Sequence, residues 1–122
     1  MTKILVIDDS ALMRRILRQH LERGGFEVED WLPLSAMEIP DRIRASAPDL
    51  VLSDYQMPGV NGLTVAKMVQ KANPGIPVVI LTAIRDPEVE ANLHKFGVKL
   101  VLGKPIDAEP LVQAVKQVLA GA

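Results

Sequence analysis

The 122 residues correspond to one domain of ordinary size, which excludes a two-domain enzyme. Fourteen Lys and Arg against fifteen Asp and Glu give a net charge of −1, which argues against direct nucleic-acid binding, and the lack of cysteine excludes disulfides, zinc–thiolate sites and thiol catalysis. Unbroken apolar runs of at most four residues exclude a membrane span, and because strand-like sequence begins near residue 3 we expect no signal peptide and a cytoplasmic location.

Short apolar runs recur along the chain at a regular spacing. Residues 4–7, 50–52, 78–81 and 100–102 predict strands that are buried on both faces, and residues 26–31 alternate in polarity as an edge strand does. These strands start near residues 3, 26, 49, 77 and 99, so each interval is long enough for a helical crossover. The rhythm predicts βαβ units around a parallel sheet.

The segments between the strands carry helix signals. Ser10 is expected to cap a helix with an apolar stripe that includes Leu12, Leu17 and Leu21. Further helices are predicted after Asn61, from Asp86 to Gly97, and from Asp107 or Ala108 onward. Between residues 35 and 46 we expect a short helix starting near Pro40, with irregular chain before it.

Polar residues stand where the predicted strands end. Asp8 and Asp9 follow the first strand, Asp54 the third, Thr82 the fourth and Lys104 the fifth. Ligands of open parallel sheets bind beyond the carboxyl ends of the strands, so we expect these side chains to converge there.

The predicted cluster is rich in negative charge. Three carboxylates and one ammonium sum to −2, and like charges about 4 Å apart repel by about 4 kcal/mol at an effective dielectric near 20. The cluster therefore calls for a divalent cation or for raised carboxylate pKa values. Since the ligand atoms are all oxygen, Mg²⁺ is favoured, and its remaining positions suit phosphate oxygens.

A set of spaced residues resembles the receiver domain of two-component response regulators. The set comprises Asp8 and Asp9, Asp54 with Met57, Pro58, Gly59 and Gly62, Thr82 with Ala83, and Lys104 with Pro105. The resemblance covers essentially the whole chain and implies a single receiver domain over residues 1–122. It also implies a flavodoxin-like (βα)5 fold, a doubly wound five-stranded parallel sheet with the strand order 2-1-3-4-5 that a chemotaxis member of that family has.

The resemblance assigns a role to each matching residue. Asp54 would accept a phosphoryl group, Lys104 would pair with phosphoryl oxygens across a cis bond to Pro105, and Thr82 would move to hydrogen-bond one of them. Mg²⁺ would be held by Asp8, Asp9, Asp54 and the backbone carbonyl of Gln56. These roles agree with phosphoryl transfer, which asks a protein mainly for positioning and charge neutralisation.

Partners follow from the same resemblance. A sensor histidine kinase or phosphotransfer protein would donate the phosphoryl group, and an output domain or effector protein would respond to it. We expect a signalling switch with self-directed phosphotransfer and autodephosphorylation chemistry rather than an enzyme. We expect no direct contact of this domain with nucleic acid or membrane. The resemblance is also compatible with a homodimer.

The sequence departs from the family pattern near the response elements. Val101 occupies the position of a rotating tyrosine or phenylalanine, and valine has little rotational range. Gln56 and Ile84 flank the expected phosphoryl site, where Gln56 is able to orient water and Ile84 is not. We therefore hypothesise that phosphorylation acts through Thr82 and backbone shifts instead of an aromatic rotation.

Three other functions fit the sequence less well. A pseudo-receiver that binds partners without phosphorylation is disfavoured because Asp9, Asp54, Thr82 and Lys104 are all present. An aspartyl-nucleophile phosphatase is disfavoured because no further acid stands two residues after Asp8 and the length leaves no cap domain. A flavin-binding protein is disfavoured because the chain has only four aromatic residues and no glycine-rich phosphate loop.

Overall fold

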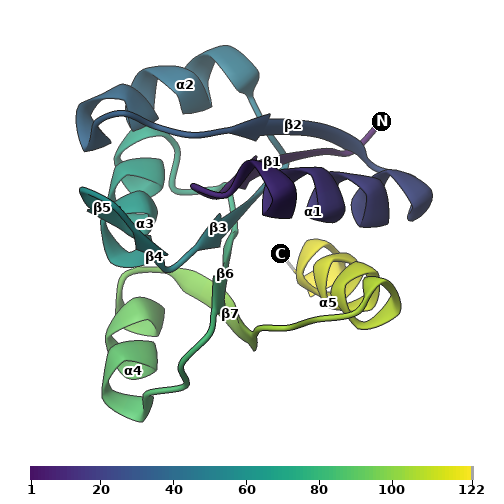
Figure 1. Ribbon diagram of the computed structural model, residues 1–122. Coiled ribbons are helices and arrows are strands. Elements are labelled where there is room, and N and C mark those ends of the chain that lie inside the picture. The colour runs from purple at the N-terminus through teal and green to yellow at the C-terminus, as the bar shows by residue number, and fades with distance from the viewer. Residues whose placement is uncertain (122) are drawn as a thin grey trace.

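Five parallel strands form the central sheet of the protein, whose computed structural model describes residues 1–121. The strands are β1 (Lys3–Ile7), β2 (Glu27–Trp31), β3 (Leu50–Asp54), β6 (Val78–Thr82) and β7 (Val98–Gly103). Their order across the sheet is β2-β1-β3-β6-β7 (Figure 1). Counting these five strands along the chain gives 2-1-3-4-5, so the predicted fold is confirmed.

Helices cover both faces of the sheet. Figure 1 shows α1 (Ala11–Arg23) and α5 (Ala108–Gly121) on one face, and α2 (Ile39–Ser46), α3 (Gly62–Ala72) and α4 (Pro87–Lys95) on the other. This division is expected when each crossover between parallel strands is right-handed and the sheet is wound from its middle in both directions. Within residues 1–121, none of the helices combines the length and apolar character needed to cross a bilayer.

The core consists of two apolar layers separated by the sheet. Leu5 and Ile7 of β1 pack on the side of α2, α3 and α4, whereas Ile4 and Val6 pack on the side of α1 and α5. All four are fully buried. Successive strand residues point to opposite faces, so a strand covered on both sides must be apolar throughout. This explains the continuous apolar runs in the sequence.

The predicted helix starts are confirmed at three positions. Ser10, Asn61 and Asp86 each accept a hydrogen bond from backbone N–H groups in the first turn of α1, α3 and α4, respectively. These bonds satisfy donors that have no partner within the helix.

Two sequence predictions are wrong in detail. The segment before Pro40 is not irregular, because Ala36–Glu38 forms a 3-10 turn closed by reciprocal hydrogen bonds between Ser35 and Glu38. A serine followed three residues later by a glutamate is a capping signal that the proline obscured. In α1, Leu12 is 64% exposed and does not belong to the buried stripe that contains Leu17 and Leu21.

A small hairpin follows β3. The two-residue strands β4 (Gln56–Met57) and β5 (Val60–Asn61) pair in antiparallel fashion, and Gly59 turns the chain with a φ of +77°. A glycine adopts this left-handed conformation without the clash that a Cβ would cause. The hairpin leads from the end of β3 into α3.

Candidate functional site

Three aspartates gather at the carboxyl edge of the sheet. Asp8 directly follows β1, Asp54 ends β3, and Asp9 is next to Asp8 in the chain. One carboxylate oxygen from each lies within 4.8 Å of the others. Asp8 and Asp54 are only 1% and 8% exposed, while Asp9 faces solvent. The predicted convergence of these acids is confirmed.

Lys104 supplies the cation of the cluster. Its Nζ donates to Oδ1 of Asp54 at 2.9 Å and to Oδ2 of Asp8 at 3.3 Å. Its backbone N–H donates to the carbonyl of Thr82 at 2.8 Å, which fixes the residue just beyond β7. The Lys104–Pro105 peptide bond is cis, as the resemblance implied. One ammonium thus joins two buried carboxylates.

Asp8 is held by groups at the start of α1. Its Oδ1 accepts a hydrogen bond from the Ser10 backbone N–H at 2.9 Å, and its carbonyl accepts one from Nη1 of Arg14 at 2.6 Å. The sequence did not predict the contact of Arg14 with Asp8, because this contact depends on how α1 packs against β1 and not on a local sequence pattern. The carboxylate of Asp8 is therefore fixed in place without any ligand.

Asp54 is positioned by the most central strand. Its carbonyl accepts a hydrogen bond from the buried hydroxyl of Ser53 at 2.9 Å, and β3 is paired with β1 on one edge and β6 on the other. The following residue, Tyr55, donates its N–H to the Leu81 carbonyl at 2.8 Å. The backbone around Asp54 consequently has little freedom to move.

The surroundings of Asp54 and Lys104 shift their protonation in the same direction. Burial raises the pKa of the Asp54 carboxyl above its ordinary value, and the charges of Asp8 and Asp9 add to this. Lys104 alone would lower that pKa, but burial and the neighbouring acids outweigh it. Burial also lowers the pKa of Lys104, yet its hydrogen bond to Asp54 and the nearby carboxylates leave the pKa raised overall. Burial is the main cause of the raised pKa of Asp54, whereas for Lys104 the neighbouring carboxylates outweigh burial.

The composition of this pocket fits a hard divalent cation. Asp8, Asp9 and Asp54 offer only carboxylate oxygens, and one ammonium leaves the set with a surplus of two negative charges. Magnesium is typically bound by one or two carboxylates and several waters, and accepts phosphate oxygens in the remaining positions. An acidic pocket with these properties suits a metal-assisted phosphoryl site.

Two predicted site residues stand apart from the cluster. The hydroxyl of Thr82 donates to the Ile84 carbonyl at 2.9 Å and accepts from the Ile84 N–H at 3.2 Å, so it is engaged with its own loop. Gln56 lies in β4 and is exposed. Both follow strands that end at this edge, but neither makes a hydrogen bond to Asp54 within residues 1–121.

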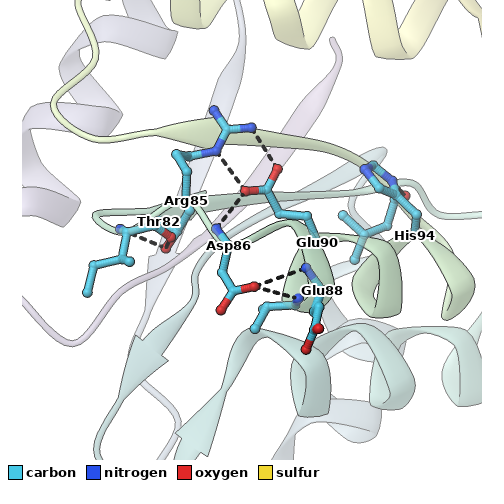
Figure 2. Close-up of polar contacts among 9 residues, drawn as sticks. Thr82, Arg85, Asp86, Glu88, Glu90 and His94 are labelled. Atoms are coloured by element: carbon cyan, nitrogen blue, oxygen red, sulfur yellow. Dashed lines mark hydrogen bonds and ion pairs between the residues drawn. The ribbon is translucent and has the colours of Figure 1, made fainter.

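The loop from Thr82 to α4 is built around charge pairs. Figure 2 shows Arg85 making a two-pronged contact with Glu90, at 2.8 and 2.7 Å, and Asp86 capping the first turn of α4. The bond from Arg85 lowers the pKa of Glu90. The charged groups of this loop are therefore already partnered with one another or with the first turn of α4.

A cavity of about 120 Å³ lies beneath this loop. Its apolar wall is made mainly by Val89, Leu93 and Val101, and Thr82, Ile84 and Tyr55 also line it. Val101 is 5% exposed and is one of the two β7 residues in the core on this side. The short valine leaves space that a larger side chain would occupy.

Comparison with known proteins gives consistent matches. A family model described as the response regulator receiver domain matches residues 4–116. The chain is 41% identical over 106 residues to a protein-glutamate methylesterase/protein-glutamine glutaminase of Anaeromyxobacter dehalogenans, covering 84% of this chain and 29% of that protein. It is 27% identical over 116 residues to the chemotaxis protein CheY of Thermotoga maritima, covering 95% and 96% of the two chains.

A solved structure shares the fold over nearly the full length. The receiver domain of the response regulator NarL from Mycobacterium tuberculosis matches with a TM-score of 0.88 and 26% identity, covering 99% of this chain and 98% of that one. The present chain spans less than a third of the methylesterase relative and almost all of the chemotaxis relative.

Proposed function

Because this chain belongs to the response regulator receiver domain family of two-component systems, we propose that Asp54 is its phosphoacceptor. One observation carries the proposal: the buried Asp54 carboxylate lies 2.9 Å from the Lys104 ammonium and within 4.8 Å of the carboxylates of Asp8 and Asp9. A nucleophilic acid beside a fixed cation and a potential metal site has the parts that phosphoryl transfer requires.

In the proposed reaction, a carboxylate oxygen of Asp54 attacks the phosphorus of a donor phosphoryl group. The bond from phosphorus to the donor nitrogen or oxygen breaks, and the donor leaves with that electron pair and takes up a proton. The product is an acyl phosphate on Asp54. Lys104 keeps its ammonium beside the reacting oxygens, and Thr82 reaches the phosphoryl group once its hydroxyl leaves Ile84.

We assign the metal to Asp8, Asp9, Asp54 and the backbone carbonyl of Gln56. The all-oxygen donor set and its surplus of two negative charges support Mg²⁺. When bound, the ion would neutralise the acids and the transferred phosphoryl oxygens. The chain itself keeps the acids in place, through the Ser10 and Arg14 contacts to Asp8 and the central position of β3.

The partners belong to the same proposal. A sensor histidine kinase or phosphotransfer protein donates the phosphoryl group, and an output domain or effector protein reads the acyl phosphate. We propose that residues 1–122 form a single cytoplasmic receiver domain that acts as a switch on itself, without turning over a separate substrate.

Mass spectrometry after incubation with acetyl phosphate and Mg²⁺ tests the assignment. We expect one alkali-labile phosphoryl adduct on the wild-type chain and none on Asp54→Asn. Asp49→Asn is the matched control, because Asp49 immediately precedes β3 at its opposite end and is exposed. It makes the same chemical change just before the start of the same strand and should leave the adduct intact.

The outcomes separate the competing functions. No adduct on the wild-type chain would contradict the proposal and favour a pseudo-receiver. An adduct that persists in Asp54→Asn would place the acceptor elsewhere. Sustained release of phosphate from added phosphomonoesters would instead indicate a phosphatase.

A further inference from the structure

The hydroxyl of Thr82 holds the backbone of Ile84. It donates to the Ile84 carbonyl at 2.9 Å and accepts from the Ile84 N–H at 3.2 Å. A hydroxyl has one proton to donate, so Thr82 is unable to donate to a phosphoryl oxygen on Asp54 while it donates to Ile84. Engagement of Thr82 with the proposed acyl phosphate therefore breaks its bond to the Ile84 carbonyl and loosens the hold on Ile84.

Ile84 is unusually placed for an apolar residue. The residue is 68% exposed, and it lies on the wall of the 120 Å³ cavity. Removal of an exposed isoleucine from water is favourable, and packing into a void restores dispersion contacts that the cavity walls lack. Both effects drive Ile84 inward once its backbone is free to move.

The cavity suits an aliphatic side chain better than a polar ligand. Val89, Leu93 and Val101 provide its apolar surface. The two acids on its rim are already engaged, since Asp86 caps α4 and Glu90 pairs with Arg85. No partnered polar group has to be freed when a hydrocarbon group enters.

Tyr55 is the other residue close enough to fill the cavity, but its position is fixed. Its N–H donates to the Leu81 carbonyl at 2.8 Å, and its carbonyl accepts from the Gly62 N–H at 2.7 Å. A Cβ placed on Gly62 would lie 3.1 Å from the ring carbon Cδ1 of Tyr55, which shows how closely the ring packs there. No hydrogen bond within residues 1–121 links Tyr55 to the Thr82 hydroxyl.

We propose that Ile84 is a lid that closes into the cavity beside Val101 when Thr82 turns its hydroxyl toward phosphorylated Asp54. The proposal rests on the phosphoacceptor function given above. In it, Ile84 makes the side-chain movement that a tyrosine or phenylalanine at the position of Val101 would otherwise make. In the resting chain the lid is open and Ile84 is exposed. In the phosphorylated chain Ile84 is buried, and the surface at the start of α4 is changed.

Methyl NMR on the full chain tests the lid. We expect nuclear Overhauser contacts from the Ile84 Cδ1 methyl to the methyls of Val101 and Leu93 after addition of Mg²⁺ and beryllofluoride, and none with Mg²⁺ alone. The Ile84 methyl shift should change severalfold more than that of Ile43, which is buried in α2 and serves as an internal control.

Filling the cavity should keep the lid open. In Val101→Phe the ring takes the space, so the Ile84 contacts should not form, whereas Val101→Ala leaves room and should preserve closure. Val101→Leu is a smaller filler that keeps the test available if the phenylalanine variant does not fold. Closure that is undiminished in both filled variants would overturn the proposal.

Removing the hydroxyl should uncouple the lid from phosphorylation. In Thr82→Val nothing holds Ile84, so its contacts to Val101 should be present before beryllofluoride is added and should not increase afterwards. Thr82→Ser retains a hydroxyl and should restore the response. A Thr82→Val variant that still closes only with beryllofluoride would overturn the role of the hydroxyl.

The same samples separate failure of the lid from failure of the proposed function. Mass spectrometry with acetyl phosphate reports adduct formation on Asp54 independently of Ile84. An adduct and a beryllofluoride complex with an unmoved Ile84 methyl would overturn the lid alone. Absence of both would overturn the phosphoacceptor assignment, and the lid with it.

Discussion

The two sides of the aspartate cluster are built differently. On the anchored side, comprising Asp8, Asp54 and Lys104, every charged group already contacts another at 2.9 or 3.3 Å. On the open side, comprising Thr82, Ile84 and Val101, the hydroxyl is turned to its own loop and a cavity remains. The side chains proposed for phosphoryl transfer are thus in contact with one another before any phosphorylation. The side chains proposed to respond to phosphorylation make no hydrogen bond to them within residues 1–121.

This difference has a topological origin. Asp8, Asp54 and Lys104 stand at the ends of adjacent or near-adjacent strands, so hydrogen bonding of the sheet brings them together. Ile84 lies in the loop between β6 and α4, where residues 83–88 are all exposed. Loops with few buried contacts move at lower cost than paired strands do. The proposed switch would thus place its reaction site on paired strands and its responding residue on a loop.

Replacing Lys104 should have the largest effect on the anchored side. Lys104→Met should lower the free energy of unfolding by about 2 to 3 kcal/mol in metal-free buffer, because two buried carboxylates lose their cation. Urea denaturation with a chelator present measures this. Lys99→Met, at an exposed position in β7, the strand that Lys104 follows, should change stability by less than about 0.5 kcal/mol. Equal stability changes in Lys104→Met and Lys99→Met would mean that the contacts of Lys104 with Asp8 and Asp54 do not stabilise the fold.

Removing a negative charge from the same cluster should have the opposite sign. Asp9→Asn should raise the metal-free free energy of unfolding by about 1 to 2 kcal/mol, since Asp9 repels two carboxylates within 4.8 Å. The stabilisation given by added Mg²⁺ should shrink at the same time. Urea denaturation with and without MgCl₂ measures both. Asp107→Asn, at an exposed position outside the cluster, is the control, and a destabilised Asp9→Asn would contradict the charge argument.

On the open side, loss of the Thr82 hydroxyl should cost less. Thr82→Val should lower the free energy of unfolding by at most about 1 kcal/mol, because burial of Ile84 in the closed lid offsets part of the loss of its two hydrogen bonds. Thr64→Val, which removes a single exposed hydroxyl contact to Asn61, is the matched control. A loss as large as that of Lys104→Met would show that Thr82 belongs to the anchored side.

The Arg85–Glu90 pair should give the smallest effect. Its arginine side chain is 56% exposed, so solvent screens the interaction. Since the folded-state pKa of Glu90 is lowered by Arg85, the pair stabilises the fold above the ordinary glutamate range, and this stability is lost as pH falls through the folded pKa. Glu90→Gln should therefore lower the melting temperature slightly at neutral pH.

Melting curves at decreasing pH check the sign for Glu90. The difference between wild type and Glu90→Gln should vanish in acid, whereas Glu88→Gln on the same helix turn should show no such trend. A difference that grows as the pH falls would contradict the prediction.

Much of the fold and the anchored side was predictable from sequence. The apolar runs marked the buried strands, and the polar residues directly after them had to meet at one edge because parallel strands all end there. Asp8, Asp54 and Lys104 were found in this way. The resemblance supplied the strand order, which the runs alone leave undetermined.

The open side and several local features were not predictable in the same way. The two bonds from Thr82 to Ile84 depend on a side-chain rotation that no spacing encodes. The 3-10 turn at Ala36–Glu38 had a signal in Ser35 and Glu38, but Pro40 was given more weight. Arg14 reaches Asp8 only through the packing of α1, which is a tertiary property.

The central position of β3 has a further consequence. Because β3 is hydrogen-bonded on both edges, its amide protons are expected to exchange with solvent only when the whole sheet comes apart. Breathing of α4 and its preceding loop therefore leaves the main chain of Asp54 undisturbed. The backbone of Asp54 is therefore expected to keep its position for as long as the protein stays folded.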